Sequence, residues 1–313
     1  MHPILSSLRH HKLTSMLLVL QVTLTCAIVC NVASLIATRM QNVSVVTGLA
    51  EAGLSTLRVN DVAPGTDPMA RHTQDLALLR AIPGVQAAAA VRGSLPLNQN
   101  GWNTTSCDDK ADSDRAEKLH SDNVAGCSQA SIYHGGPGQL TVMGLKLVEG
   151  RDFQSSEYVR PGPYDINPIP AMIVSRSLAE RLYPGQDALG ESVFVDDKTI
   201  PIVGIVETLV RPSLGESATD GDSMLYPVIP DKASVLYLLR SDPKDQAQVL
   251  RDAQKVLLKA EPQRIINDAR SYSELRHAYF QGDYTMIGLL LTSALGLLTV
   301  TIIGIAGLAG FWV

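Results

Sequence analysis

The sequence predicts an α+β protein anchored in a membrane, with one large polar domain between two membrane-spanning helices. Residues 13–38 and 284–313 carry no charged side chain. Each is long enough to supply the roughly 20 apolar residues that cross a bilayer as a helix. Every Asp and Glu lies between them. A strand–helix–strand pattern near each end of the polar domain indicates mixed α and β structure.

Charge predicts the orientation. Residues 1–12 form a leader that ends in Arg-His-His-Lys, and the positive-inside rule places such a leader in the cytoplasm. Residues 39–283 are then extracytoplasmic, which in a bacterium means periplasmic. A cleaved signal peptide is the alternative for 13–38, but this run is longer than the apolar core of a signal peptide, usually about 7–15 residues.

The polar domain is acidic. The chain has 31 Asp and Glu against 26 Lys and Arg, and three of these basic residues precede the first acidic one, Glu51. An acidic domain has no electrostatic reason to bind nucleic acid, so we exclude nucleic acid as a partner.

The first strand–helix–strand unit begins at Leu54–Asn60, where apolar and polar residues alternate as in a half-buried strand. A turn is expected over 63–66. Asp67, followed by proline, is a typical N-cap for a helix that continues to about Ala81. Val85–Val91 is the second strand.

The same order returns later in the chain. Residues 233–239 are expected to form a strand, Asp242 and the following proline to cap a helix through Leu258, and 264–269 to form another strand. Two such units predict a split ferredoxin-like lobe with its helices on one face. This porter-like lobe covers about 50–95 and 230–270.

Residues 96–229 are expected to form an inserted second lobe of mixed α/β structure. Its predicted elements are strands over 171–174 and 200–206 and a short helix over 177–182. The aspartates between 108 and 114 lack the glycine and terminal glutamate of an EF-hand, so we expect a solvated loop there.

A helix is expected from Ser271, because Ser271 and Glu274 have the spacing of a capping box. No proline occurs between Ser271 and Val313. A continuous helical stalk from the domain into the second membrane span is therefore predicted.

Four cysteines fall into two pairs. Cys107 and Cys127 lie in one polar stretch of the external domain, where an oxidising compartment favours a disulfide; two free thiols are the alternative. Cys26 and Cys30 lie one helical turn apart in the first span and are interpreted as packing residues.

Motifs that carry catalysis do not occur. The sequence has no phosphate-binding G-x-x-x-x-G-K-[ST] loop, no H-E-x-x-H and no G-x-S-x-G, and its seven histidines are scattered. We therefore expect a protein that is not an enzyme and that needs no cofactor or metal.

Three stretches carry a family resemblance. They are MGLKLVEGRDF (143–153), IVSRSLAERLYPGQDALG (173–190) and IPIVGIV (200–206), and they resemble the periplasmic core of MacB-type ABC transporter permeases within the FtsX-like group. The motif residues are expected to shape turns and strand ends rather than to form a catalytic site. They are Gly150, Arg151, Phe153, Pro184, Gly185, Asp187, Leu189 and Gly190.

The resemblance implies a permease subunit of an ABC exporter or mechanotransmission complex in the bacterial inner membrane. The implied partners are the lipid bilayer, a separate ABC ATPase, a second copy or a paralogous permease, and a periplasmic adaptor protein. Such permeases have four membrane helices, so a chain ending at Val313 is expected to be truncated after its second.

Two other functions fit the same layout. One is a membrane-anchored extracytoplasmic sensor domain, and the other is an FtsX-like regulator of cell-wall hydrolases.

Overall fold

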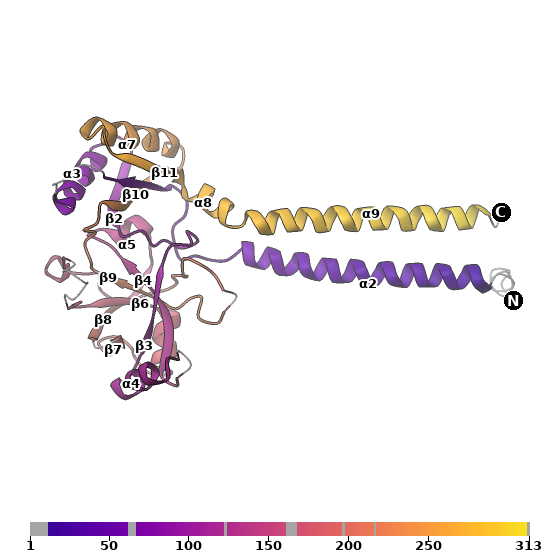
Figure 1. Ribbon diagram of the computed structural model, residues 1–313, viewed down its shortest axis with the longest axis horizontal. Helices are drawn as coiled ribbons and strands as arrows, with labels where there is room; N and C mark the ends of the chain where they lie inside the picture. The colour runs from indigo at the N-terminus through magenta and orange to yellow at the C-terminus, as the bar shows by residue number, and fades with distance from the viewer. Residues whose placement is uncertain are drawn as a thin grey trace. The chain divides into compact units, whose positions relative to one another are not determined.

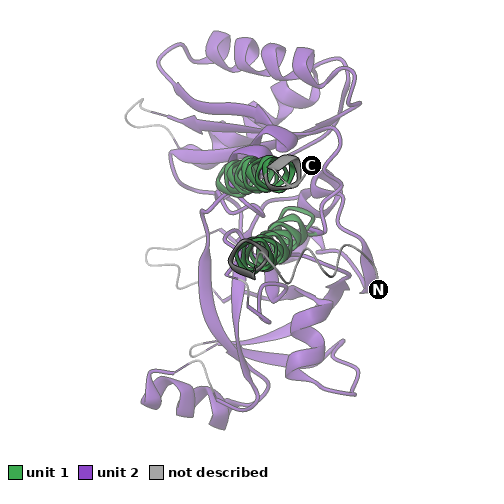
Figure 2. Cartoon of the chain, turned by 90° about the vertical axis from the view of Figure 1, so that its right-hand side faces the viewer, with its two compact units in different colours: residues 1–45, 280–313 green, residues 46–279 purple. Residues whose placement is uncertain are grey.

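The computed structural model describes residues 12–61, 67–121, 124–160, 168–195, 198–215 and 217–311. The chain divides into two compact units (Figure 2). The first unit consists of Met1–Val45 with Phe280–Val313, and the second of Val46–Tyr279. Nearly all of the predicted leader and the turn predicted over 63–66 lie outside the described residues.

The first unit contains two long helices, α2 (Lys12–Val43) and α9 (Gln281–Phe311). Within them, Met16–Val43 and Gln281–Gly307 are long and apolar enough to cross a membrane. The helices pack antiparallel (Figure 1). Their partly or fully buried positions follow alternating three- and four-residue steps, the spacing that keeps one stripe of each helix against its partner. These positions include Leu18, Val22, Thr25, Val29, Val32 and Ile36 on α2, and Ile287, Leu290, Ala294, Leu297, Thr301 and Gly304 on α9.

Polar contacts join the helix pair along its length. The Thr25 and Thr301 hydroxyls lie 2.9 Å apart, and Arg39 Nη1 lies 3.1 Å from Asp283 Oδ1. A Cβ at Gly304 would lie 2.8 Å from Gln21 Nε2, so glycine makes room there for the glutamine side chain. Close approach at a small residue is a common feature of membrane helix pairs.

Helix α2 also has a small and polar face, formed by Thr23, Ala27, Asn31 and Ser34. These four residues are exposed, so this face lies away from α9. On α9, the glycines at 296 and 307 have open space where a side chain would be.

The second unit contains a four-stranded sheet in the order β11-β1-β10-β2, and neighbouring strands are antiparallel. Helix α3 connects β1 to β2, helix α7 connects β10 to β11, and the two helices contact each other. Both predicted strand–helix–strand units are therefore present. The bounds are β1 (Leu54–Asn60), α3 (Pro68–Arg80), β2 (Val85–Val91), β10 (Ser234–Ser241), α7 (Gln246–Ala260) and β11 (Ile265–Ser271). We call this part the four-stranded lobe.

Apolar side chains fill the space between this sheet and its helices. Leu57, Leu79, Tyr237 and Leu257 are fully buried there. A short helix, α5 (Gln139–Met143), contacts β2 and β10, and Figure 1 shows it on the side of the sheet away from α7. The sheet is thus covered on both faces.

The remaining strands form a sheet in the order β5-β8-β6-β9-β4-β3-β7, and β7 also pairs with β8. All of these strands except β5 therefore form a closed ring, which we call the ring lobe. Met172, Val193, Ile202 and Met224 are fully buried in its core. The bounds are β3 (Trp102–Cys107), β4 (Cys127–His134), β5 (Leu147–Gly150), β6 (Met172–Ser175), β7 (Ser192–Val195), β8 (Lys198–Val206) and β9 (Ser223–Tyr226).

Two helix starts differ from prediction. The Asp242 carboxylate accepts from the Lys244 amide and closes a turn, so α7 begins later, at Gln246. Of the aspartates expected in a loop, Asp112 and Asp114 belong to helix α4 (Lys110–Leu119). Asp109 caps this helix, because its carboxylate accepts from the amides of Ala111 and Asp112. Sequence analysis interpreted these aspartates as a solvated loop and did not recognise Asp109 as an N-cap.

The predicted continuous stalk is also wrong. Helix α8 (Tyr272–Tyr279) ends before Phe280, and α9 starts at Gln281. Gly282, a poor helix former, follows directly, so a break needs no proline. The capping box of α8 is confirmed: the Glu274 amide lies 3.2 Å from Ser271 Oγ, and the Ser271 amide lies 2.7 Å from Glu274 Oε2.

Candidate functional site

Gly150 and Leu189, from two of the motif stretches, meet at the end of β5. Gly150 has a φ of +73°, and a Cβ there would lie 2.3 Å from the Val203 carbonyl oxygen and 2.7 Å from Leu189 Cδ1. Glycine is required both by the left-handed conformation and by the close approach of β8. Stretch 143–153 therefore touches stretch 173–190 at this point. The third stretch, 200–206, is part of strand β8 and lies against both.

Arg151 and Phe153 shape the turn that follows. The Arg151 guanidinium makes two bonds to the Glu157 carboxylate, at 2.8 and 2.6 Å, and Glu157 also accepts from the Gln154 amide. The bonded guanidinium holds the pKa of Glu157 below its ordinary value. Phe153 packs edge-on against Tyr158 with ring centroids 6.0 Å apart. These contacts fix the conformation of the loop over residues 151–158.

The other motif residues shape the turn between α6 (Arg176–Leu182) and β7. Pro184 is exposed, and Gly185 has a φ of +75° with open space around it. Asp187 Oδ1 accepts from the Leu189 amide at 2.9 Å, and the Gly190 amide donates to the Ile202 carbonyl oxygen at 2.9 Å. This turn is thereby attached to β8.

A buried carboxylate also holds elements of the ring lobe together. Asp222 is fully buried and accepts from Ser128 Oγ at 2.6 Å, Ser177 Oγ at 2.5 Å and Arg181 Nε at 2.5 Å. These donors come from β4 and α6, and Asp222 directly precedes β9. Sequence analysis missed this group, because nothing local distinguishes Asp222 from a surface aspartate.

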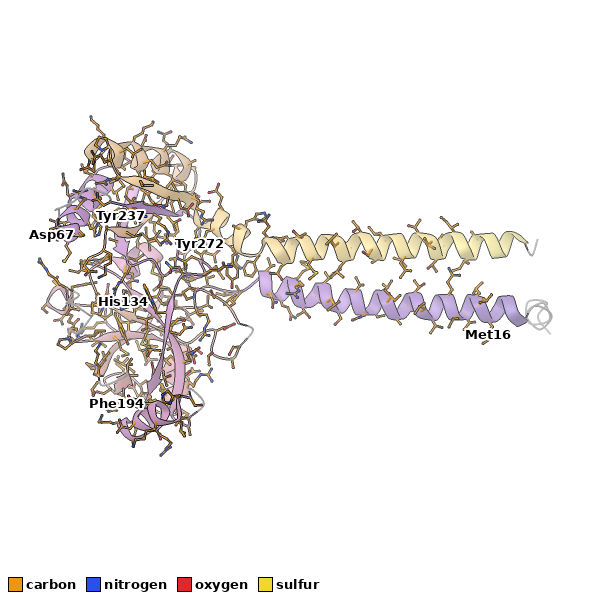
Figure 3. All side chains as sticks on the ribbon, in the orientation of Figure 1. Met16, Asp67, His134, Phe194, Tyr237 and Tyr272 are labelled. Carbon is orange, nitrogen blue, oxygen red and sulfur yellow. A yellow bond between two sulfur atoms is a disulfide. The ribbon has the colours of Figure 1, made fainter. Side chains whose placement is uncertain are left out.

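The four-stranded lobe has its own buried polar network beneath α3. Asp75 accepts from the Tyr237 hydroxyl at 2.7 Å and from Arg264 Nη1 at 2.9 Å. His72 Nδ1 lies 3.0 Å from the same hydroxyl, and Nε2 lies 2.9 Å from the Lys232 carbonyl oxygen. Tyr237, labelled in Figure 3, links Asp75 to His72, because its hydroxyl contacts both side chains.

Burial lowers the pKa of the His72 imidazole from its ordinary value of 6.5, against the opposite pull of the Lys232 carbonyl and the Asp75 carboxylate. The folded state therefore binds this proton less readily than the unfolded state. The stability that His72 contributes is full above pH 6.5 and falls as the pH drops below it.

We predict that His72→Gln weakens this pH dependence. The difference in unfolding free energy between the native chain and His72→Gln should be larger at about pH 7.5 than at about pH 5.5. Denaturant titrations at both values measure it. A difference that stays constant or grows in acid contradicts the prediction.

Cys107 and Cys127 are directly opposite each other on β3 and β4, with Cα atoms 4.1 Å apart, and are joined by a disulfide in the structure. Ala116 of α4 and Val124 pack over the bond. Cys26 and Cys30 are exposed on α2 and have free thiols.

We predict that the Cys107–Cys127 bond forms in the cell and that reducing it weakens the ring lobe by about 3 kcal/mol, because it closes a loop of about 20 residues. Peptide mapping without reductant, and unfolding with and without it, measure both parts. Alkylation of both thiols without reductant contradicts the prediction.

Within the described ranges, no group of three His, Cys, Asp or Glu side chains could hold a metal ion. One hollow beside β2 is lined by Arg80, Gln86 and Thr141 among others. Its one cationic side chain is already engaged, because Arg80 Nη2 donates to the Ala88 carbonyl oxygen at 2.8 Å.

The arrangement of the whole chain is the remaining evidence on function. In the chain, a mixed α/β unit lies between two membrane-length helices, and its motif residues shape turns. The family model described as the MacB-like periplasmic core domain matches residues 17–270. The chain belongs to this family of ABC-type transporter permease domains.

Solved structures similar to the chain include two domains of transporters. The extracellular domain of the noncanonic ABC-type transporter YknZ from Gram-positive bacteria is 13% identical, with a TM-score of 0.40, over 68% of this chain and 100% of that one. The periplasmic region of MacB from Actinobacillus actinomycetemcomitans is 11% identical, with a TM-score of 0.44, over 74% and 94%. No curated protein matches the chain.

Proposed function

We propose that the chain is a permease subunit of an ABC-type exporter or mechanotransmission complex, in which a separate ATPase drives movement of the external domain. The observation that carries the proposal is the family match over residues 17–270, which covers nearly all of the folded second unit and most of α2. The given sequence contains no phosphate-binding loop, and in this proposal a separate ATPase subunit supplies the energy.

We propose the following membrane topology. Residues 1–12 are cytoplasmic, 13–38 and 284–313 span the bacterial inner membrane, and 39–283 are periplasmic. We further propose that the four-stranded lobe is a split ferredoxin-like lobe, since its strand order and its two helices support that assignment.

The proposed partners are a separate ABC ATPase, a second copy or a paralogous permease, a periplasmic adaptor protein and the lipid bilayer. In this proposal the motif residues from Gly150 to Gly190 are structural. Their contacts fasten β5, β8 and the turn before β7 into one rigid region that can move as a body.

We predict that reporter fusions near Ser155 are active for a reporter that works in the periplasm and silent for one that works in the cytoplasm, because the basic leader stays inside. Fusions at the same residue with both reporters measure the orientation. The reverse pattern contradicts it, and with it the placement of the domain.

A further inference from the structure

Helix α8 directly precedes the membrane-length helix α9 in the chain, and its tyrosines hold two distant segments of the second unit. Tyr272, labelled in Figure 3, is fully buried, and its hydroxyl donates to the Pro96 carbonyl oxygen at 3.0 Å. At the other end of the helix, the Tyr279 hydroxyl accepts from the Leu214 amide at 2.8 Å. Burial raises the pKa of Tyr272 well above its ordinary value, so the hydroxyl remains a donor.

Pro96 belongs to the segment 92–101, which leads from β2 of the four-stranded lobe to β3 of the ring lobe. We call it the interlobe segment. Leu97 and Gln99 have φ values of 63° and 57°, a left-handed conformation that L side chains rarely adopt. The Gln99 amide donates to the Pro212 carbonyl oxygen at 3.0 Å. The interlobe segment is therefore strained, and it is held at several points.

The chain that follows α2 enters the same group of contacts. Glu51 Oε1 lies 2.6 Å from Arg276 Nη1 of α8 and accepts from Thr47 Oγ1 at 2.7 Å. The Val210 amide in turn donates to the Thr47 carbonyl oxygen. Helix α8 thus contacts three segments at once: Glu51 in the segment after the first membrane helix, Pro96 in the interlobe segment, and Leu214.

We propose that α8 is a latch that keeps the interlobe segment in its left-handed conformation. Displacing α8 releases Pro96, lets the strained residues relax and allows the two lobes to change their relative orientation. The latch is a property of the second unit. Only the source of the displacement, a movement of α9 driven by a separate ATPase, rests on the proposed function.

The test is hydrogen–deuterium exchange of the whole chain in lipid nanodiscs, without nucleotide. Tyr272→Phe removes only the hydroxyl and is expected to raise amide exchange in 93–100 about tenfold. Tyr183→Phe is the matched control, because the Tyr183 hydroxyl donates to the Ser192 carbonyl oxygen at 2.8 Å, away from α8. The control is expected to leave exchange in 93–100 unchanged.

A second variant separates strain from packing. Gln99 is exposed, so Gln99→Gly removes the backbone strain at residue 99 without removing a buried contact. We expect it to lower exchange in 93–100 and to reduce the effect of Tyr272→Phe when the two are combined. If Tyr272→Phe does not fold, Tyr279→Phe serves instead, with higher exchange expected in 208–215.

The latch is overturned if Tyr272→Phe leaves exchange in 93–100 unchanged, or if Tyr183→Phe raises it equally. If Tyr279→Phe is used instead, unchanged amide exchange in 208–215 likewise overturns the latch. Because no nucleotide is present, these exchange results do not depend on an ATPase partner. The latch can therefore be confirmed even if the proposed function is wrong.

Discussion

Gly150→Ala is expected to destabilise the ring lobe by more than about 4 kcal/mol, beyond the range of ordinary substitutions. The added Cβ would lie 2.3 Å from the Val203 carbonyl oxygen and 2.8 Å from the Gly204 Cα, so two backbone segments must move apart. The left-handed φ adds about 1–2 kcal/mol of strain. Denaturant unfolding of the whole chain in detergent, followed through Trp102 fluorescence, measures the loss.

Gly185→Ala is the matched control for this prediction. Its φ of +75° is nearly that of Gly150, but nothing lies within 4 Å of a Cβ there. It is expected to cost only the backbone strain, about 1–2 kcal/mol. Equal effects of the two substitutions would mean that the close packing of β5 on β8 does not matter to stability.

Asp75→Ala is expected to destabilise the four-stranded lobe by about 3–5 kcal/mol, the usual cost of removing one partner of a buried ion pair. The side chains of Asp75 and Arg264 are only 3% and 2% exposed, so the substitution leaves the guanidinium buried without its carboxylate. It also removes the acceptor of the Tyr237 hydroxyl. Proteolysis or hydrogen exchange of the lobe measures the free energy.

The double variant Asp75→Ala with Arg264→Met tests the cause. Replacing both members of a buried pair by apolar groups is far less costly than breaking it, so the double variant is expected to be more stable than Asp75→Ala alone. A double variant that is less stable than the single one shows that the charge left unpaired is not the source of the loss.

Local signals in the sequence were sufficient for the four-stranded lobe. The predicted strands Leu54–Asn60 and Val85–Val91 match the bounds of β1 and β2, and the Asp67 cap starts α3 as predicted. Each of these features depends on neighbours within a few residues. The half-buried character expected of Leu54–Asn60 is wrong, because Ser55 and Thr56 are buried as well.

The break at Phe280 was missed, because a helix can end without proline when its last turn is bound elsewhere. The last turn of α8 is bound in this way, through the Tyr279 hydroxyl and the Leu214 amide.

The ring lobe was only partly predictable. Its β3 strand, Trp-Asn-Thr-Thr-Ser-Cys, is polar and resembles a loop, and it forms because β4 pairs with it along its whole length. Closure of the ring depends on pairs far apart in the chain, such as Cys107 opposite Phe194. The motif residues were found from the family resemblance, but their purpose, the contact of Leu189 with Gly150 over β8, requires the folded ring.

The most direct test of the central claim is ATP hydrolysis by the tagged protein purified from its own membranes. We predict that the chain alone hydrolyses no ATP, and that it co-purifies with a separate subunit carrying a phosphate-binding loop. Replacing the lysine of that loop should abolish hydrolysis in the complex and any ATP-dependent change in exchange of the second unit. Hydrolysis by the chain alone, or a second unit that behaves identically with and without ATP in the complex, would contradict the account.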